Sequence, residues 1–545
     1  MSNQIVRGTM LLTGATFLSK FLGMIYVIPF HELVGQSGGA LFNFAYAPYN
    51  IFLSISTVGV PLAVSKFVSR YNSLGDYKTS MRMFRAGMGL MAITGITAFL
   101  LLFLSAQWIA PLVITNDQPT GITKDDVTMV IRTVSFALIV IPAMSIVRGF
   151  FQGHQSMGPT AVSQVVEQIV RILFLLAASF MVLKIWNGTI TTAIGFATFA
   201  AFVGALASCV VLWVYWQKRK PYIKKQISQQ DTTYDVPVRH LFKELFRYAG
   251  PFVLVGLATS LYQLVDMFTF ERAMTAIGYS GEEWETAYGV INFYGHKIVI
   301  IPGTIATGLS LAILPALTSS FTQNNRPLLF QQMNQALQII AVLVIPAVSG
   351  LTVLSDVVYG SLFTLENLNI TGSLLGWYAP VGLLFSLFTV TSSILQGINE
   401  QRFAVVSLSA GLLIKVLFNI QLIYTFGAKG AIFGTALAAG VAVLLNLWRI
   451  GSSINFSFKQ TLKRTLLVCI FVIVMCIAIW IVRTIVAQFL PPVAESRWAA
   501  IVTLVMSVGI GASIYLWLSY KSELLERTLG DRVRVLDKLF VRKRS

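Results

Sequence analysis

Long apolar segments alternate with short polar connections along the whole chain. Each apolar segment reaches the length of roughly 20 residues that an α-helix needs to cross a bilayer. The pattern predicts fourteen membrane-spanning helices, an even number that places both chain ends on the same side of the membrane. The predicted helices are 6–30, 40–66, 84–112, 128–150, 157–183, 190–216, 246–271, 286–319, 334–360, 373–396, 403–425, 428–449, 464–488 and 498–520.

The connections between these segments alternate in charge. Lysine and arginine are concentrated in the second, sixth and twelfth connections and in the C-terminal tail. Acidic residues are concentrated in the third and seventh connections, at Asp117, Asp125 and Asp126 and at Glu282, Glu283 and Glu285. By the positive-inside rule, the basic connections and both termini are expected to be cytoplasmic.

Composition narrows the class of protein and of chemistry. Hydrophobic residues make up 56% of the chain and charged residues only 11%, against about 25% charged in soluble domains, and the mean hydropathy is +0.74. The chain is therefore expected to be a polytopic integral membrane protein. The net charge of +18 does not indicate nucleic-acid binding, because the basic residues lie in alternate connections. There is no GxxxxGK[ST] loop and no Cys/His cluster with metal spacing, so the sequence predicts neither an ATP site nor a metal or cofactor site.

One stretch of the sequence recurs roughly 245 residues later. The segment Arg148–Phe174 returns as Ser392–Phe418, and Asn43-Phe44 returns as Asn292-Phe293. The matched positions are Gln152-Gly153 with Gln396-Gly397, Ser163 with Ser407, Arg171 with Lys415, Leu173-Phe174 with Leu417-Phe418, and Gly59, Leu62 and Ala63 with Gly308, Leu311 and Ala312. Two matches in the same order suggest a duplicated half-chain, which predicts two similar lobes that face each other and bind a ligand between them.

The repeat also predicts the domain boundaries. Helices 1–6 form an N-terminal lobe at 1–216, a basic cytoplasmic linker follows at 217–245, and helices 7–12 form a C-terminal lobe at 246–449. Helices 13 and 14, at 464–520, have no counterpart in the first half. The tail at 521–545 places apolar side chains on one helical face among basic residues, which predicts an amphipathic helix on the anionic inner leaflet. A solvated helix or a disordered tail is the alternative.

Charges inside the predicted helices are the main candidates for a binding site. A lone charge at the bilayer centre costs about 2.5–3.5 kcal/mol, so it is expected to face a cavity or a partner. Five cations fall within the predicted helices: Lys20, Arg132, Arg171, Lys297 and Lys415. Arg132 lies near a helix end and is expected to snorkel. Arg171 follows Glu167 by one turn, which leaves two alternatives open, an internal ion pair and a ligand-binding role.

The remaining cations have no acidic neighbour in the sequence. Lys20 and Lys297 are deep in their helices, and Lys415 occupies the position of Arg171 in the second repeat. Asp266 is the clear lone acid and the candidate for an ion or proton site. Because cations predominate, the expected ligand is an anion such as a phosphate or pyrophosphate, whereas a cation exporter would need lone carboxylates. Salt bridges of the two lysines with Asp266 or with the opposite lobe are the alternative.

The chain also resembles a known family. The segments GTMLLTGATFLSKFLGMIYVIPF, STVGVPLAVSKFVSRYNSLGD and YGHKIVIIPGTIATGLSLAILPAL are similar to the polysaccharide-exporter branch of the MOP (MATE-like) superfamily. The likeness is to the MurJ-type (YtgP-like) lipid II flippases of Gram-positive bacteria, and it extends over essentially the whole chain. It implies an all-α integral membrane fold of two six-helix lobes related by a pseudo-two-fold repeat. Helices 13 and 14 would then form a lipid-facing groove for a polyprenyl tail.

The resemblance also implies roles for individual residues. Gram-negative members carry an Arg where Lys20 stands and an Asp-Arg pair where His296-Lys297 stand, so these residues are implied to bind substrate. The second Arg of helix 1 falls on Tyr26, which places Tyr26 in the same implied site, and an Arg pair of helix 2 falls near Phe52-Leu53. This chain thus has fewer cations there than those members have.

The function implied is alternating-access flipping of lipid II, a peptidoglycan precursor for the cell wall and cell shape, from the inner to the outer leaflet of the bacterial plasma membrane. The implied partners are the polyprenyl-pyrophosphate lipid, membrane lipids and cell-wall synthesis enzymes, with no nucleic acid. No ATP site is expected, so a membrane potential or an ion gradient would drive transport. The alternatives are a flippase for another undecaprenyl-pyrophosphate-linked oligosaccharide or a sporulation paralogue, a MATE-type cation-coupled drug exporter, and a membrane scaffold without transport.

Overall fold

The computed structural model describes residues 14–15, 17–57, 64–65, 68–69, 71–72, 74–115, 121–154, 156–230 and 254–529. These residues form helices, turns and short connections, and no strand occurs among them. The chain divides into two compact units, Met1–Glu285 and Thr286–Ser545. An all-α membrane fold is therefore confirmed.

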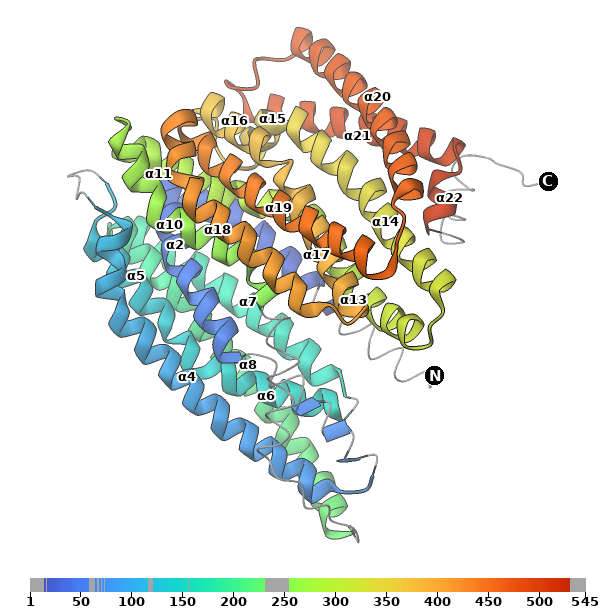
Figure 1. The fold of residues 1–545 in the computed structure, drawn as a ribbon. Helices are drawn as coiled ribbons and strands as arrows, with labels where there is room; N and C mark the ends of the chain where they lie inside the picture. The colour runs from blue at the N-terminus through green and yellow to red at the C-terminus, as the bar shows by residue number, and fades with distance from the viewer. Residues whose placement is uncertain are drawn as a thin grey trace. The chain divides into compact units, whose positions relative to one another are not determined.

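The described residues of the first unit form a series of helices (Figure 1). They are Phe17–Ile25, α2 (Val27–Thr57), α4 (Tyr77–Val113), α5 (Lys124–Ser135), α6 (Ala137–Gly153), α7 (Gly158–Phe180), the π-helix η1 (Met181–Ile185), α8 (Ile190–Ser228) and α10 (Ala258–Ala276). Helix α11 (Gly281–Gly289) crosses the boundary between the units.

The second unit begins with a broken helix and ends with the helices that have no repeat counterpart. Its elements are η2 (Val290–Tyr294), α12 (Gly295–Val299), α13 (Ile301–Thr322), α14 (Arg326–Val353), α15 (Ser355–Leu362), α16 (Leu368–Tyr378), α17 (Val381–Gly397), α18 (Gln401–Phe426), α19 (Ala428–Ile454), α20 (Lys459–Phe489), α21 (Arg497–Lys521) and α22 (Leu524–Leu529).

Ten helices among the described residues are long and apolar enough to cross a membrane, or eleven if the bent pair Phe17–Ile25 and Val27–Thr57 is one span. These ten coincide with the predicted helices 3–6 and 9–14. Predicted helix 7 begins in residues outside the described ranges, and predicted helix 8 is broken into α11, η2, α12 and α13. The number of fourteen spans stays a prediction with which the described residues are consistent.

The first two predicted helices are joined more closely than the sequence suggests. The expected connection at 31–39 is helical apart from a kink at Gly35, whose φ of 66° lies in a region that favours glycine. A second break, of 45°, separates Phe17–Ile25 from α2 at Tyr26. The polar sequence there marks a change of helix direction and not an extended loop.

Hydrogen bonds place the connections at two opposite ends of the first unit. At one end, the backbone N–H of Lys78 donates to Gln230 Oε1 (2.7 Å), and Gln230 Nε2 donates to Asp76 (2.8 Å). At the other end, Ile122 N–H donates to Glu285 Oε1 over 2.7 Å. The basic second and sixth connections therefore share one end, as the charge pattern predicts.

The region of the predicted linker differs from the expectation in its first part. Helix α8 continues to Ser228, so the segment expected to begin a linker at residue 217 is helical, because apolar side chains such as Ile223 still pack against the unit. Residues 231–253 lie outside the described ranges. Helix α10, predicted to open the C-terminal lobe, packs against α2 and α4 within the first unit. The predicted lobe boundaries themselves stay a prediction.

The two copies of the repeat form matching pairs of helices. Helix α7 packs along α8 and helix α18 along α19, and the matched residues Ser163 and Ser407 are both fully buried. Close approach is possible where the side chain is absent: a Cβ on Gly204 of α8 would lie 2.8 Å from the Glu167 carbonyl oxygen of α7. Asn43 and Asn292 are likewise both buried. Residues 59–63 of the second match lie outside the described ranges.

The two extra helices pack within the second unit. Helices α20 and α21 lie against α14 and α15 (Figure 1). Arg483 of α20 forms an ion pair with Asp356 of α15, and the Tyr515 hydroxyl of α21 donates to the Val342 carbonyl over 2.7 Å. Leu525 of α22 is buried in the same core, so it contacts protein and not lipid. The predicted amphipathic tail beyond residue 529 lies outside the described ranges.

Candidate functional site

Lys20 and Tyr26 lie on the first helix and differ in exposure. Lys20 is exposed, and the described part of the chain offers its ammonium no hydrogen bond or ion pair. Tyr26 is only 4% exposed and lies at the break between Phe17–Ile25 and α2. The helix approaches α7 closely, since a Cβ on Gly23 would lie 3.1 Å from Gln168 Nε2. Lys20 is therefore available to a ligand in the conformation described.

Arg171 of α7 lies beside a group of tyrosines. Its guanidinium is within electrostatic range of the hydroxyls of Tyr26, Tyr46 and Tyr49, which we name the tyrosine cluster, and of Glu167. The rings of Tyr46 and Tyr49 are 5.4 Å apart in an edge-to-face arrangement. Phenolic hydroxyls can donate hydrogen bonds to an anion, so the cluster and Arg171 together form a polar, cationic group. Tyr46 and Tyr49 were not predicted, because neither carries a charge that stands out in an apolar segment.

The carboxylate of Glu167 belongs to a different pair from the one that the spacing suggested. Its ion pair is with Arg148 of α6, at 2.6 Å, whereas no ion pair with Arg171 occurs among the described residues. Arg148 also donates to Ser163 (3.0 Å) and to Ser208 of α8 (2.8 Å). The alternative in which Glu167 and Arg171 form an ion pair within one helix is therefore wrong. The carboxylate of Glu167 pairs with a different helix because α6 brings Arg148 close to it.

Lys297 and His296 are adjacent in sequence but point in different directions. The Nδ1 atom of His296 lies 2.6 Å from the Tyr378 hydroxyl, and the ring is buried against Phe385. Lys297 is partly exposed, with its Nζ atom 5.9 Å from the centre of the Phe293 ring. The π-helix η2 just before them adds a residue to one turn and thereby turns α12 relative to the preceding segment. Of this pair, Lys297 is the one accessible to a ligand.

Lys415 is enclosed in the second unit. It has no exposed surface, and its Nζ atom donates to Thr435 Oγ1 of α19 over 2.5 Å. The matched residue Arg171 is partly exposed. The two repeat copies therefore use the same position differently, and Lys415 lies at a helix contact in this conformation.

Asp266 lies on α10 and is 2% exposed. The same helix carries a second buried acid, Glu271, which accepts hydrogen bonds from both the backbone N–H and the hydroxyl of Thr115. The sequence did not single out Glu271, because it lies at the edge of the predicted helix. Within the described ranges, no group of three or more His, Cys, Asp or Glu residues could hold a metal ion.

The sequence matches a known protein family over most of the length of the chain. Residues 5–321 match the family described as Polysaccharide biosynthesis protein. The chain is 45% identical to the Lipid II flippase MurJ of Bacillus subtilis (strain 168), over 98% of this chain and 98% of the relative. The chain belongs to the polysaccharide biosynthesis protein family.

One further relative and one solved structure bear on the fold. The Stage V sporulation protein B of Bacillus subtilis (strain 168) is 23% identical over 98% of this chain and 99% of its own length. The solved structure described as Lipid II flippase MurJ, inward closed conformation, has a TM-score of 0.65 at 17% identity, covering 95% of this chain and 99% of that one. The fold predicted from the resemblance is thereby confirmed. The chain is a multi-pass protein of the bacterial plasma membrane and a transporter, not an enzyme.

Proposed function

We propose that this protein moves lipid II from the inner to the outer leaflet of the plasma membrane by alternating access. The observation that carries the proposal is the 45% identity to a lipid II flippase over nearly the full length of both chains. The sporulation relative covers as much of the chain at about half that identity. This difference favours lipid II over another lipid-linked oligosaccharide.

The accessible cations are the groups that can bind the charged part of the substrate. Lipid II carries a pyrophosphate, and lysine and arginine are the side chains that hold such anions. Lys20 in the first unit and Lys297 in the second are exposed or partly exposed, and Arg171 with the tyrosine cluster adds a third cationic group. We infer that these residues contribute to headgroup binding during the transport cycle. Tyr26 takes part as a hydrogen-bond donor, and His296 supports Lys297 from its buried position.

A MATE-type exporter is the second candidate considered. Such a protein would need carboxylates available to a cation inside the membrane. Glu271 is held by Thr115 and Glu167 by Arg148. The predominance of accessible cations therefore supports an anionic substrate, and Asp266 remains the candidate for a coupled proton or ion.

An apolar crevice in the second unit suits a long hydrocarbon chain. It has a volume of about 430 Å³ and lies between α14 and α20. Its walls are formed by Ser349, Val353, Val472, Ile473, Cys476, Ile477 and Trp480. We infer that this crevice is part of the groove for the polyprenyl tail. Both termini are inferred to be cytoplasmic, and cell-wall synthesis enzymes are the expected consumers of the flipped lipid.

The proposal is tested by depletion in a strain that depends on this protein. Lipid II is expected to accumulate in the inner leaflet, while other undecaprenyl-linked precursors stay at their normal level. A probe that cannot cross the membrane, such as a lipid II-degrading enzyme added outside, would report the loss of outer-leaflet lipid II. Accumulation of a different lipid-linked oligosaccharide, with lipid II export unchanged, would refute the assignment.

A further inference from the structure

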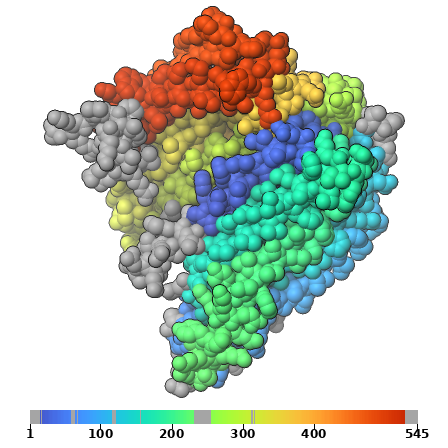
Figure 2. Space-filling view, turned by 180° about the vertical axis from the view of Figure 1, so that it is seen from behind, coloured from blue at the N-terminus to red at the C-terminus, as the bar shows by residue number. Residues whose placement is uncertain are grey.

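A groove along α4, α6 and α8 of the first unit contains two cavities of different chemistry. One has a volume of about 450 Å³ and an apolar lining, and the other has a volume of about 540 Å³ and lies at the basic end of α8. Figure 2 shows this end of α8, in green, exposed at the edge of the first unit. Neither cavity includes a residue of the site described above.

The apolar cavity opens toward the membrane. Its walls include Met88 of α4, Val140 and Met144 of α6, and Leu212 and Trp213 of α8. The Trp213 side chain is 60% exposed, which on a membrane-spanning helix means contact with lipid. A cavity with this lining can hold a hydrocarbon chain but no polar group.

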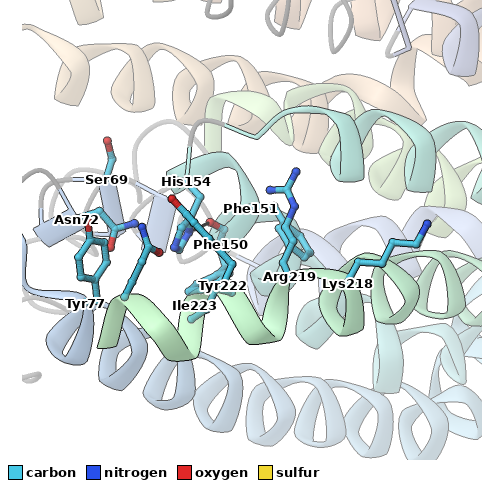
Figure 3. A pocket seen from close by; sticks show the side chains of 12 residues that line it. Ser69, Asn72, Tyr77, Phe150, Phe151, His154, Lys218, Arg219, Tyr222 and Ile223 are labelled. Carbon is cyan, nitrogen blue, oxygen red and sulfur yellow. Dashed lines mark hydrogen bonds between the residues drawn. The ribbon is translucent and has the colours of Figure 1, made fainter. Parts of the chain in front are cut away.

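The second cavity combines cations with unused hydrogen-bond acceptors (Figure 3). Lys218 and Arg219 lie on one side of it, and the Arg219 guanidinium is 5.5 Å from the centre of the Phe151 ring. On the opposite side lies Asn72, whose Oδ1 atom is buried without a hydrogen-bond partner in the described part of the chain. Gln226 also lines the cavity, and its Oε1 atom is likewise buried without a hydrogen-bond partner among the described residues.

His154 adds a further acceptor between these two sides. Its Nδ1 atom lies 3.0 Å from the Phe150 carbonyl oxygen, so Nδ1 carries the proton and donates it. Burial lowers the pKa of His154, which keeps the ring neutral near pH 7 and leaves Nε2 as an acceptor. The cavity therefore offers two cations for an anion and several acceptors for hydroxyl groups.

The two cavities lie on the same faces of the same helices. On α8, Leu212 and Arg219 are separated by two turns, which corresponds to about 10 Å along the axis. Trp216 lies between them, with its ring 5.2 Å from that of Phe84 and 5.5 Å from that of Phe150. Tryptophan with an apolar cavity on one side and a cationic one on the other is typical of the boundary between hydrocarbon and headgroup.

We propose that this groove binds a phospholipid with an anionic, hydroxylated headgroup, of which phosphatidylglycerol is the simplest form. The phosphate contacts Lys218 and Arg219, and the two headgroup hydroxyls donate to two of the three acceptors of Asn72, Gln226 and His154. One acyl chain follows α8 past Trp216 into the apolar cavity. Since the basic end of α8 is the one that the positive-inside rule assigns to the cytoplasm, the lipid comes from the inner leaflet. The site is separate from the transported substrate and does not depend on its identity.

The test uses the full-length protein in phosphatidylcholine vesicles that contain a small amount of phosphatidylglycerol with a photoactivatable acyl chain. Cross-linked peptides are mapped by mass spectrometry. Labelling is expected in 209–216 and 140–147, and Lys218→Gln with Arg219→Gln should lower it about fivefold for each cation removed. The matched control, Lys224→Gln with Lys225→Gln, removes two exposed cations of the same helix that do not line the cavity. It should leave labelling unchanged.

Three results would overturn the proposal. Equal labelling by a photoactivatable phosphatidylcholine, or equal loss in the test and control variants, would mean that the groove holds bulk lipid without headgroup recognition. Loss of labelling in the presence of free glycerol phosphate at moderate concentration would assign the polar cavity to a soluble ligand. Thermal unfolding of each variant is measured in parallel, and a selective loss of labelling at unchanged stability supports the site.

Discussion

At the scale of single residues, the lysines that the sequence singled out separate by their burial. Lys20 is exposed and Lys297 partly exposed, whereas Lys415 is fully enclosed beside Thr435. A charge that is accessible can bind and release a ligand, while an enclosed one is held by its neighbours. The accessible lysines are therefore the ones that we expect to affect transport directly.

Replacing either accessible lysine should impair transport without unfolding the protein. We expect Lys20→Ala and Lys297→Ala each to lower lipid II export about tenfold or more, because a charge-assisted hydrogen bond contributes about 1.5–3 kcal/mol. Arginine at either position should restore part of the export. The matched control is Lys184→Ala, which removes an exposed lysine of η1. Full export by both alanine variants at normal expression would exclude the proposed role.

A buried carboxylate in the acidic connections should make stability depend on pH. Burial raises the pKa of Glu285, and hydrogen bonds from Ser37 and the Ile122 N–H lower it only in part. The folded state thus favours the protonated form of Glu285. The stability of the folded protein therefore falls as pH rises above the pKa that Glu285 has in the unfolded state. Glu285→Gln removes this loss, so its Tm should exceed that of the unaltered protein at pH 7.5 and approach it at pH 4, a gain of order 1 kcal/mol.

The neighbouring acid provides a control of opposite sign. Hydrogen bonds from the backbone and hydroxyl of Ser280 lower the pKa of Glu283. Its ionised form stabilises the fold above the unfolded-state pKa, so Glu283→Gln should lower the Tm at pH 7.5 and have little effect at pH 4. The same pH trend in both variants would contradict this explanation.

At the scale of elements, polar contacts hold the matched helix triplets together in two different ways. In the first unit, Arg148 of α6 connects Glu167 of α7 with Ser208 of α8. In the second unit, Asn446 of α19 donates to Thr391 (3.0 Å) and Ser392 (3.1 Å) of α17. Position 392 is the repeat counterpart of position 148, so a neutral contact replaces a charged one there. The packing is retained although the chemistry has changed.

Double-mutant cycles can distinguish the partner of Glu167. Glu167→Gln leaves Arg148 unpaired and should lower stability by roughly 3 kcal/mol, since breaking a largely buried pair costs about 3–5 kcal/mol. Adding Arg148→Gln should recover part of this loss. Adding Arg171→Gln should give a nearly additive effect. Thermal unfolding in detergent is measured for the unaltered protein, the three single variants and the two double variants. Coupling that is larger with Arg171 than with Arg148 would contradict the ion pair in the structure.

At the scale of the whole molecule, we propose that the signs of charge set the direction of transport. The substrate is an anion, and the accessible residues Lys20, Arg171 and Lys297 are cations. Moving each negative charge outward across a membrane that is negative inside is favourable by about 2.3 kcal/mol per 100 mV. The return of an empty, positively charged protein is favoured by the same potential. No ATP is then required for either half of the cycle.

Collapse of the membrane potential should therefore slow lipid II export strongly. An ionophore that removes the potential, while ATP and the pH gradient are kept, is expected to lower export about tenfold or more. Outer-leaflet lipid II is measured before and after addition. Removal of the pH gradient alone is the control and should have a smaller effect unless Asp266 carries a coupled proton. Export that continues at the original rate without a potential would exclude this driving force.

The sequence by itself determined the class of this protein and ten of its spans, and it indicated the repeat. Apolar segments of bilayer length can only be membrane helices, because every backbone polar group must be satisfied within the segment. The alternation of charge predicted that the second and sixth connections lie at the same end of the helices. The hydrogen bond between Lys78 and Gln230 shows that they do. The cost of a charge in the membrane singled out Lys20 and Lys297 as candidates, and their binding role stays a prediction.

The tertiary structure decided which charged groups pair and which stay accessible. The spacing along one helix suggested an ion pair between Glu167 and Arg171. The packing of α6 against α7 instead brings Arg148 to the Glu167 carboxylate. Burial likewise separated Lys415 from Arg171, although the repeat makes them equivalent. The contact of the tyrosine cluster with Arg171 and the groove of α4, α6 and α8 both join segments far apart in the sequence. Local patterns carry no information about such contacts, because they depend on which faces of different helices meet.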